Sequence, residues 1–87
     1  MRLAIFASGR GSNAQAIVRA YREGRLGFVE PVFIFSDKHS PVIAWAKEQG
    51  LDHAVLPAKD YPGREAHEEA IVALLQERDI DLIALAG

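Results

Sequence analysis

A short glycine loop directly follows the first apolar segment of the chain. Residues 3–7 read Leu-Ala-Ile-Phe-Ala, residues 8–13 read Ser-Gly-Arg-Gly-Ser-Asn, and a helical pattern of apolar residues begins at once. A buried strand that enters a helix through a glycine turn aims free backbone N–H groups and the positive end of the helix dipole at one point. Such a point binds anions, usually phosphate. The loop therefore predicts an α/β fold with a ligand at the carboxyl end of the first strand.

The rest of the chain alternates between strand and helix patterns. Strands are expected at residues 2–7, 28–36, 53–56 and 81–86, and helices from residue 12 to about 23, from 41 to about 50 and from 64 to 78. Ser12 or Asn13 is expected to cap the first helix, and Pro41 suits the first turn of the second. The alternation with short connections predicts a Rossmann-like parallel sheet of order 3-2-1-4 with helices on both faces.

The fourth expected strand has no helix after it. Residues 82–85 read Leu-Ile-Ala-Leu and are apolar on both sides, while the third helix alone would cover one face of the sheet. An exposed apolar edge strand is prone to pair with another chain. We therefore expect a homo-oligomer that buries the fourth strand or the third-helix face, or a complementing C-terminal half as partner.

Composition excludes several classes of function. The 87 residues make one small domain, with a net charge of -2, scattered charges and no cysteine. The chain has no basic stripe of the kind that binds nucleic acid. It also has no apolar stretch of the roughly 20 residues that a membrane span needs. Without cysteine, neither a disulfide nor a thiolate metal site is possible. We expect a cytoplasmic protein that has no metal and contacts neither nucleic acid nor a membrane.

The glycine loop is open to three interpretations. Gly9 and Gly11, followed by Ala14, match the dinucleotide fingerprint G-x-G-x-x-G/A, and Asp37 could bind a ribose, although it lies further on than the usual ~20 residues. A plain strand-to-helix turn is the second interpretation. The third is a phosphate-monoester site, because the Ser12 hydroxyl, the Asn13 amide and the N–H groups of residues 11–13 together suit a terminal phosphate. We favour the third and keep a dinucleotide-binding module and a non-catalytic self-assembling scaffold as alternatives.

Residues 7–17, Ala-Ser-Gly-Arg-Gly-Ser-Asn-Ala-Gln-Ala-Ile, resemble the opening motif of the phosphoribosylglycinamide formyltransferases, S-G-x-G-[ST]-N-x-[QE]-A-I. Residues 35–38, 64–66 and 82–87 are also similar to segments of that family. The resemblance covers residues 1–87 as the N-terminal, nucleotide-binding half of the formyltransferase domain. The related methionyl-tRNA formyltransferases and formyltetrahydrofolate deformylases share the fold but do not typically carry Gly-Ser-Asn in this loop.

The resemblance implies a substrate and a role for several residues. Gly11, Ser12 and Asn13 would hold the phosphate of glycinamide ribonucleotide, and Gly87 would lie beside its glycinamide and ribose end. Arg64 would face the co-substrate, 10-formyltetrahydrofolate, which donates the formyl group in purine biosynthesis. A solvated helix-start residue remains the alternative for Arg64, and a chain-end glycine without a role is the alternative for Gly87.

The family's catalytic residues have no counterpart in this chain. The resemblance places an Asn, a His in an H-P-S context and an Asp beyond the fourth strand. His39 and His53 are expected at the surface and at a strand start, and His67 is expected to be mostly exposed on the third helix. Their spacing does not suit a metal site. We assign no catalytic residue and expect the chain to be inactive alone.

Overall fold

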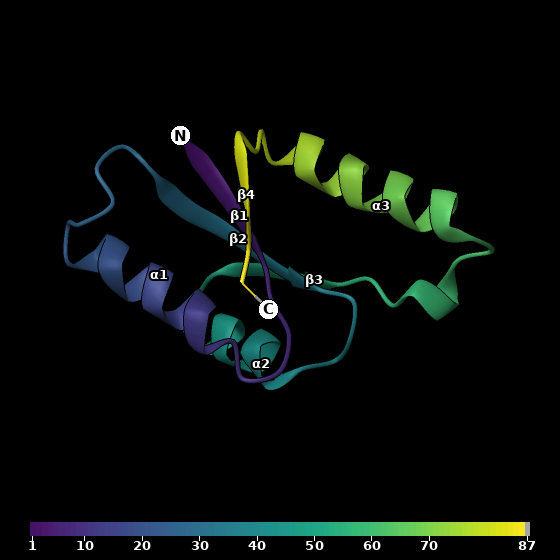
Figure 1. The fold of residues 1–87 in the computed structure, drawn as a ribbon, viewed down its shortest axis with the longest axis horizontal. Helices are drawn as coiled ribbons and strands as arrows, with labels where there is room; N and C mark the ends of the chain where they lie inside the picture. The colour runs from purple at the N-terminus through teal and green to yellow at the C-terminus, as the bar shows by residue number, and fades with distance from the viewer. Residues whose placement is uncertain (87) are drawn as a thin grey trace.

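The computed structural model describes residues 1–86, so the expected role of Gly87 lies outside the described residues. Its strands are β1 (Arg2–Phe6), β2 (Glu30–Ser36), β3 (Asp52–Val55) and β4 (Leu82–Leu85), and its helices are α1 (Ser12–Arg22), α2 (Pro41–Glu48), the 3₁₀ turn η1 (Ala58–Asp60) and α3 (Arg64–Glu77). The four strands form one parallel sheet in the order β3-β2-β1-β4 (Figure 1). The predicted order 3-2-1-4 is confirmed.

The strands end level with one another at one edge of the sheet. The register pairs Phe6 with both Phe35 and Leu85. The ladder continues past the strands, because the Ala7 N–H donates to the Phe35 carbonyl at 3.0 Å and the Ala86 N–H donates to the Phe6 carbonyl at 2.8 Å. Loops that leave this edge therefore gather where ligands bind in open α/β sheets.

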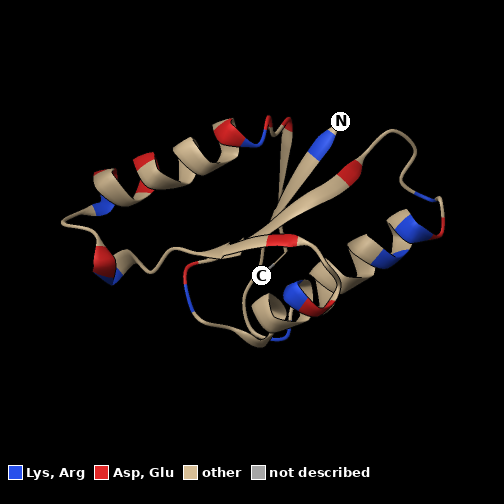
Figure 2. Ribbon diagram, turned by 180° about the vertical axis from the view of Figure 1, so that it is seen from behind, with Lys and Arg blue, Asp and Glu red and all other residues tan. Residues whose placement is uncertain are grey.

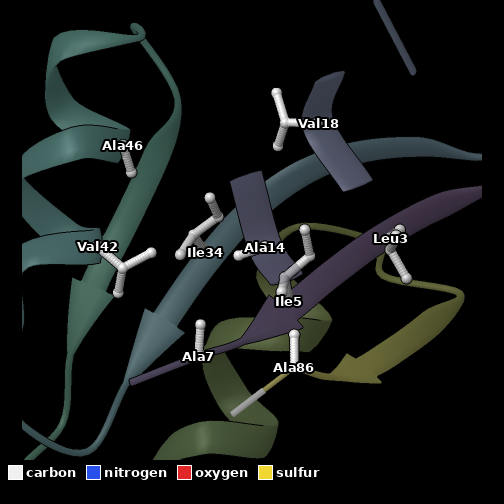
Figure 3. Packing of buried hydrophobic residues seen from close by; sticks show 9 residues of the cluster. All are labelled: Leu3, Ile5, Ala7, Ala14, Val18, Ile34, Val42, Ala46 and Ala86. Carbon is white, nitrogen blue, oxygen red and sulfur yellow. The ribbon is translucent and has the colours of Figure 1, made fainter. Parts of the chain in front are cut away.

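The helices cover the two faces of the sheet unequally, as predicted. α1 and α2 lie on one side and α3 lies alone on the other (Figure 1). Between the sheet and the helix pair lies a cluster of buried apolar side chains that includes Ile5, Ala14, Val18, Ile34, Val42 and Ala46 (Figure 3). On the α3 side the buried residues are Ala4, Phe33, Phe35 and Leu56. No residue of α3 is itself buried among the described residues, so this second layer is thin.

The predicted boundaries differ from the observed ones at several ends. β2 begins at Glu30 rather than at residue 28, because Gly27 takes a positive φ of 61° and the Val29 N–H closes a turn on the Leu26 carbonyl at 3.1 Å. Phe28 is left 93% exposed in that turn. The connection between the third expected strand and the third expected helix contains η1, which the sequence pattern missed.

β4 is an edge strand with exposed apolar side chains. Leu82, Ile83 and Leu85 are 40%, 50% and 83% exposed.

Within residues 1–86, no helix has the length and apolar content that a membrane span requires.

Candidate functional site

The loop between β1 and α1 has a defined backbone shape. Gly11 lies in the left-handed region, with φ 66° and ψ 40°, and serves as the N-cap residue of α1. Its carbonyl accepts the Gln15 N–H at 2.8 Å, which closes the first helical turn. Neither Ser12 nor Asn13 caps the helix, and no side-chain hydrogen bond does so in this described turn. The capping prediction was wrong because Gly11 occupies the capping position one residue earlier.

The first turn of α1 leaves backbone donors for a ligand. The N–H groups of Ser12, Asn13 and Ala14 belong to the first turn, whose N–H groups have no partner within a helix. Ser12 and Asn13 are exposed, so their hydroxyl and amide groups are accessible beside those N–H groups. The Gly11 N–H, which we expected to be a donor too, instead donates to the Ser8 carbonyl at 3.1 Å. The donor set therefore begins at Ser12.

Helix α2 packs against the loop and holds it in place. The Val42 N–H donates to the Gly9 carbonyl at 3.0 Å, and the buried Val42 side chain lies directly against Gly11. An added Cβ on Gly11 would stand only 2.1 Å from Val42 Cγ2. The loop thus needs glycine at position 11 for two reasons, its positive φ and the close approach of α2.

The charge distribution favours an anion at this loop. The first turn of α1 contains no acidic residue, whereas Arg19 and Arg22 lie in its last turn. Acidic side chains are instead concentrated along α3, on the other side of the sheet (Figure 2). The positive end of the α1 dipole is therefore not neutralised by a carboxylate of its own helix.

Arg64 is not part of the loop. It begins α3, on the opposite face of the sheet from α1, and its side chain is 91% exposed. Its Nε atom donates to Glu68 Oε1 at 3.0 Å, one helical turn along. The structure keeps Arg64 accessible to a solvent-borne anion but separates it from Ser12 and Asn13.

Asp37 bears on the dinucleotide alternative. It lines a cavity of about 360 Å³ with Lys38, His39 and residues 57–59, between the ends of β2 and β3. None of residues 8–13 lines that cavity. Asp37 thus lines a cavity to which the glycine loop does not contribute.

Two of the three histidines are hydrogen-bonded to backbone carbonyls. His39 is exposed, as expected, and His53, which lies on β3, has its Nδ1 atom 2.9 Å from the Leu51 carbonyl oxygen. His67 was expected to be exposed, but it is half-buried: its Nε2 lies 2.7 Å from the Leu56 carbonyl oxygen and its ring packs on Tyr61. No group of three or more potential metal ligands occurs among residues 1–86.

Sequence patterns did not reveal two supporting residues of the loop. Val42 belongs to the buried core, and it also holds Gly9 and Gly11 in place. The Gln15 side-chain amide donates to the Arg10 carbonyl at 3.0 Å. The sequence marks Gln15 only by its position in the formyltransferase motif, four residues after Gly11.

Comparison with known proteins places the whole chain in one group. A family model described as formyl transferase matches residues 1–87. The chain is 33% identical over 86 residues to a phosphoribosylglycinamide formyltransferase of Bacillus subtilis, covering 99% of this chain and 44% of that protein. It is also 33% identical to a trifunctional purine biosynthetic protein adenosine-3 of Drosophila pseudoobscura, of which it covers only 6%.

Solved structures agree with the sequence relatives. A phosphoribosylglycinamide formyltransferase from Bacillus halodurans superposes with a TM-score of 0.94 at 39% identity, over all of this chain and 45% of that one. A glycinamide ribonucleotide transformylase from Geobacillus kaustophilus gives 0.91 at 41% identity, over 97% of this chain and 45% of that one. The chain therefore spans less than half the length of these relatives and corresponds to their N-terminal part. The chain belongs to the formyl transferase family.

Proposed function

We propose that this chain binds the phosphate of glycinamide ribonucleotide, as the nucleotide-binding part of an enzyme that transfers a formyl group from 10-formyltetrahydrofolate to the glycinamide amine. The family match and the names of the relatives support the reaction. The observation that carries the proposal is the first turn of α1, where the N–H groups of Ser12, Asn13 and Ala14 lie beside two accessible polar side chains.

The chemistry of this turn suits a phosphate monoester. Its dianion accepts hydrogen bonds through three terminal oxygens, and charge-assisted bonds of this kind are stronger than neutral ones. The backbone N–H groups, the Ser12 hydroxyl and the Asn13 amide together offer enough donors for those oxygens. Gly11 contributes the backbone shape and the close packing on α2, in place of the N–H that is already bonded to Ser8.

The proposal gives the two other predicted residues peripheral roles. Arg64, with its exposed guanidinium, would pair with an anionic group of 10-formyltetrahydrofolate by exchanging Glu68 for the ligand. An exposed ion pair of this kind contributes little stability, about 0–1 kcal/mol, so the exchange costs little. We further propose that Gly87 lies beside the glycinamide and ribose end of the substrate.

Formyl transfer needs more than a phosphate anchor. The attacking amine must lose a proton to a general base, and the tetrahedral oxyanion must be stabilised by positioned donors. Within residues 1–86, none of the three histidines contacts the loop through a hydrogen bond. We therefore propose that this chain supplies binding and that the reacting groups come from outside it.

Backbone amide NMR of the chain during titration with glycinamide ribonucleotide tests the proposal. We expect shifts concentrated at Ser12, Asn13 and Ala14. The variant Asn13→Asp keeps the side-chain shape but faces the phosphate with a negative charge, and we expect at least about tenfold weaker binding. Gln49→Glu, the same amide-to-carboxylate change at the end of α2, is the matched control for net charge and should bind like the unsubstituted chain.

Each outcome of the titration has a defined meaning. Shifts with glycinamide ribonucleotide but not with NADH support the phosphate-monoester site. Shifts with NADH that reach Asp37 would favour the dinucleotide alternative. Equal weakening by Asn13→Asp and Gln49→Glu, or no binding by the unsubstituted chain, would contradict the proposal for this chain.

A further inference from the structure

The peptide group that joins Arg10 to Gly11 is held at both of its polar ends. Its N–H, which belongs to Gly11, donates to the Ser8 carbonyl at 3.1 Å. Its C=O, which belongs to Arg10, accepts the Gln15 side-chain amide at 3.0 Å. Because the C=O and N–H of a trans peptide point in opposite directions, each of these bonds reinforces the orientation that the other requires.

We propose that Gln15 is a positioning residue for the anion site: its carboxamide fixes the peptide group of Arg10 and Gly11, and with it the backbone that leads into the donors of Ser12 and Asn13. The inference rests on the proposed function for its ligand, and on the described contacts for its geometry. Gln15 acts through the loop backbone and need not touch the phosphate itself.

The electrostatic reason lies in what a rotated peptide group would face. If the peptide group of Arg10 and Gly11 turned over, its carbonyl oxygen would leave Gln15 and take the place of the Gly11 N–H opposite the Ser8 carbonyl, so that two acceptors would face each other. The loop would then have to change its shape, and the donors of Ser12 and Asn13, which follow directly in the chain, would be displaced. A glycine at position 11 makes such a rotation easy, since glycine occupies positive and negative φ about equally.

Gln15 is well placed for this task because it belongs to the helix that binds the ligand. Its backbone N–H donates to the Gly11 carbonyl at 2.8 Å, while its side chain reaches back to Arg10. The residue is half-buried, although its bond to the Arg10 carbonyl is exposed to solvent. From the other side, the bond from the Val42 N–H to the Gly9 carbonyl ties the loop to α2. Rotation of the peptide group of Arg10 and Gly11 is the motion that the Gln15 bond opposes.

The test compares Gln15→Met, which keeps the length of the side chain without the donor, with the unsubstituted chain. Gln76→Met is the matched control, because Gln76 lies exposed on α3, on the other side of the sheet. Binding of inorganic phosphate and of glycinamide ribonucleotide is measured by amide NMR, together with the melting temperature. We expect Gln15→Met to bind both about five- to tenfold more weakly, the effect of one hydrogen bond, and Gln76→Met to bind normally.

A second readout needs no ligand. Hydrogen exchange of the Gly11 amide should be faster in Gln15→Met, because rotation of the peptide group breaks its bond to Ser8. Exchange of the Leu51 amide, which donates to Ala46 at the end of α2, should not change. If the unsubstituted chain binds neither probe, the proposed function fails for this chain, and this exchange measurement alone decides the role of Gln15.

Two results would overturn the inference. One is Gln15→Met with unchanged phosphate affinity and unchanged exchange at Gly11. The other is a lower melting temperature with full affinity in the folded state, which would make Gln15 a stabilising residue of α1 only. Gln15→Glu, whose ionised carboxylate accepts but cannot donate, is expected to bind phosphate at least as weakly as Gln15→Met.

Discussion

Cγ2 of Val42 lies 2.1 Å from the point where a side chain on Gly11 would begin. This close approach joins the start of α2 to the start of α1 and holds the loop in position. Both residues are buried, so neither can move outward to make room. Gly11 therefore has two required properties, its left-handed backbone conformation and its lack of a Cβ atom. The two can be tested separately.

Gly11→Ala is expected to destabilise the chain by about 3 kcal/mol, since it adds overpacking against Val42 to the cost of a left-handed alanine. Gly50→Ala is the matched control, because Gly50 has a φ of 72° and nothing within 4 Å of an added Cβ. It should cost only about 1–2 kcal/mol. Urea unfolding of both variants measures the difference.

The double variant Gly11→Ala with Val42→Ala checks that the excess arises from this contact. Removal of the Val42 methyl groups costs core packing by itself, but it should make Gly11→Ala less harmful than in the parent chain. Equal destabilisation by Gly11→Ala and Gly50→Ala would show that the loop can shift away from α2.

The sequence predicted the order of the sheet because its evidence is local and repeated. Each strand is a short apolar run, each helix carries a 3.6-residue pattern, and short connections between them leave few topologies. The place of the anion loop followed from the same evidence, since Gly9 and Gly11 directly follow the first run.

The details of the loop could not be predicted in this way, because they depend on contacts between distant residues. The backbone conformation of Gly11 decides both that Gly11 rather than Ser12 caps α1 and that its N–H is used internally. The half-buried state of His67 depends on the Leu56 carbonyl, 11 residues away, which no helical periodicity reveals.

Arg78 is expected to stabilise the thin α3 layer. Its guanidinium lies 4.3 Å from the centroid of the buried Phe33 ring, pairs with Asp52 at the start of β3, and donates to the Leu74 carbonyl at 3.1 Å. Arg78→Met keeps much of the apolar stem but removes these three interactions. We expect a loss of about 1–2 kcal/mol in the free energy of unfolding, measured with urea.

Arg64→Met is the control for Arg78→Met, because it makes the same change at the other end of α3. The Arg64 side chain is 91% exposed, against 23% for Arg78. Its removal should leave stability nearly unchanged. Similar losses for the two variants would mean that the Phe33 contact contributes nothing specific.

The purified chain is expected to transfer no formyl group above the background rate. Within residues 1–86, His67 and His53 are bonded to backbone carbonyls, and His39 lines the cavity of Asp37, to which residues 8–13 do not contribute. A general base must come within hydrogen-bond reach of the amine, and we expect none of the three to reach it. The measurement is an assay with glycinamide ribonucleotide and 10-formyltetrahydrofolate.

The Bacillus subtilis relative, assayed at the same concentration, serves as the positive control for formyl transfer. Turnover by the 87-residue chain that rises in proportion to its concentration would contradict the expectation. Loss of such turnover in His39→Ala would then identify a base that the geometry does not suggest.

The exposed side chains of β4 are expected to drive self-association. Ile83 and Leu85 pair in register with Ala4 and Phe6, whose side chains pack on the α3 side, so they present an apolar surface on that side of the sheet. Edge strands of this kind add to one another. We expect light scattering to show a dimer or a larger species at high concentration. The double variant Ile83→Lys with Leu85→Lys should be a monomer, because two buried like charges per copy oppose pairing.

Phe28→Lys, in the turn before β2, is the control for loss of an exposed apolar residue, since Phe28 is 93% exposed. It should associate like the unsubstituted chain. A monomer for the unsubstituted chain would show that this edge stays solvated.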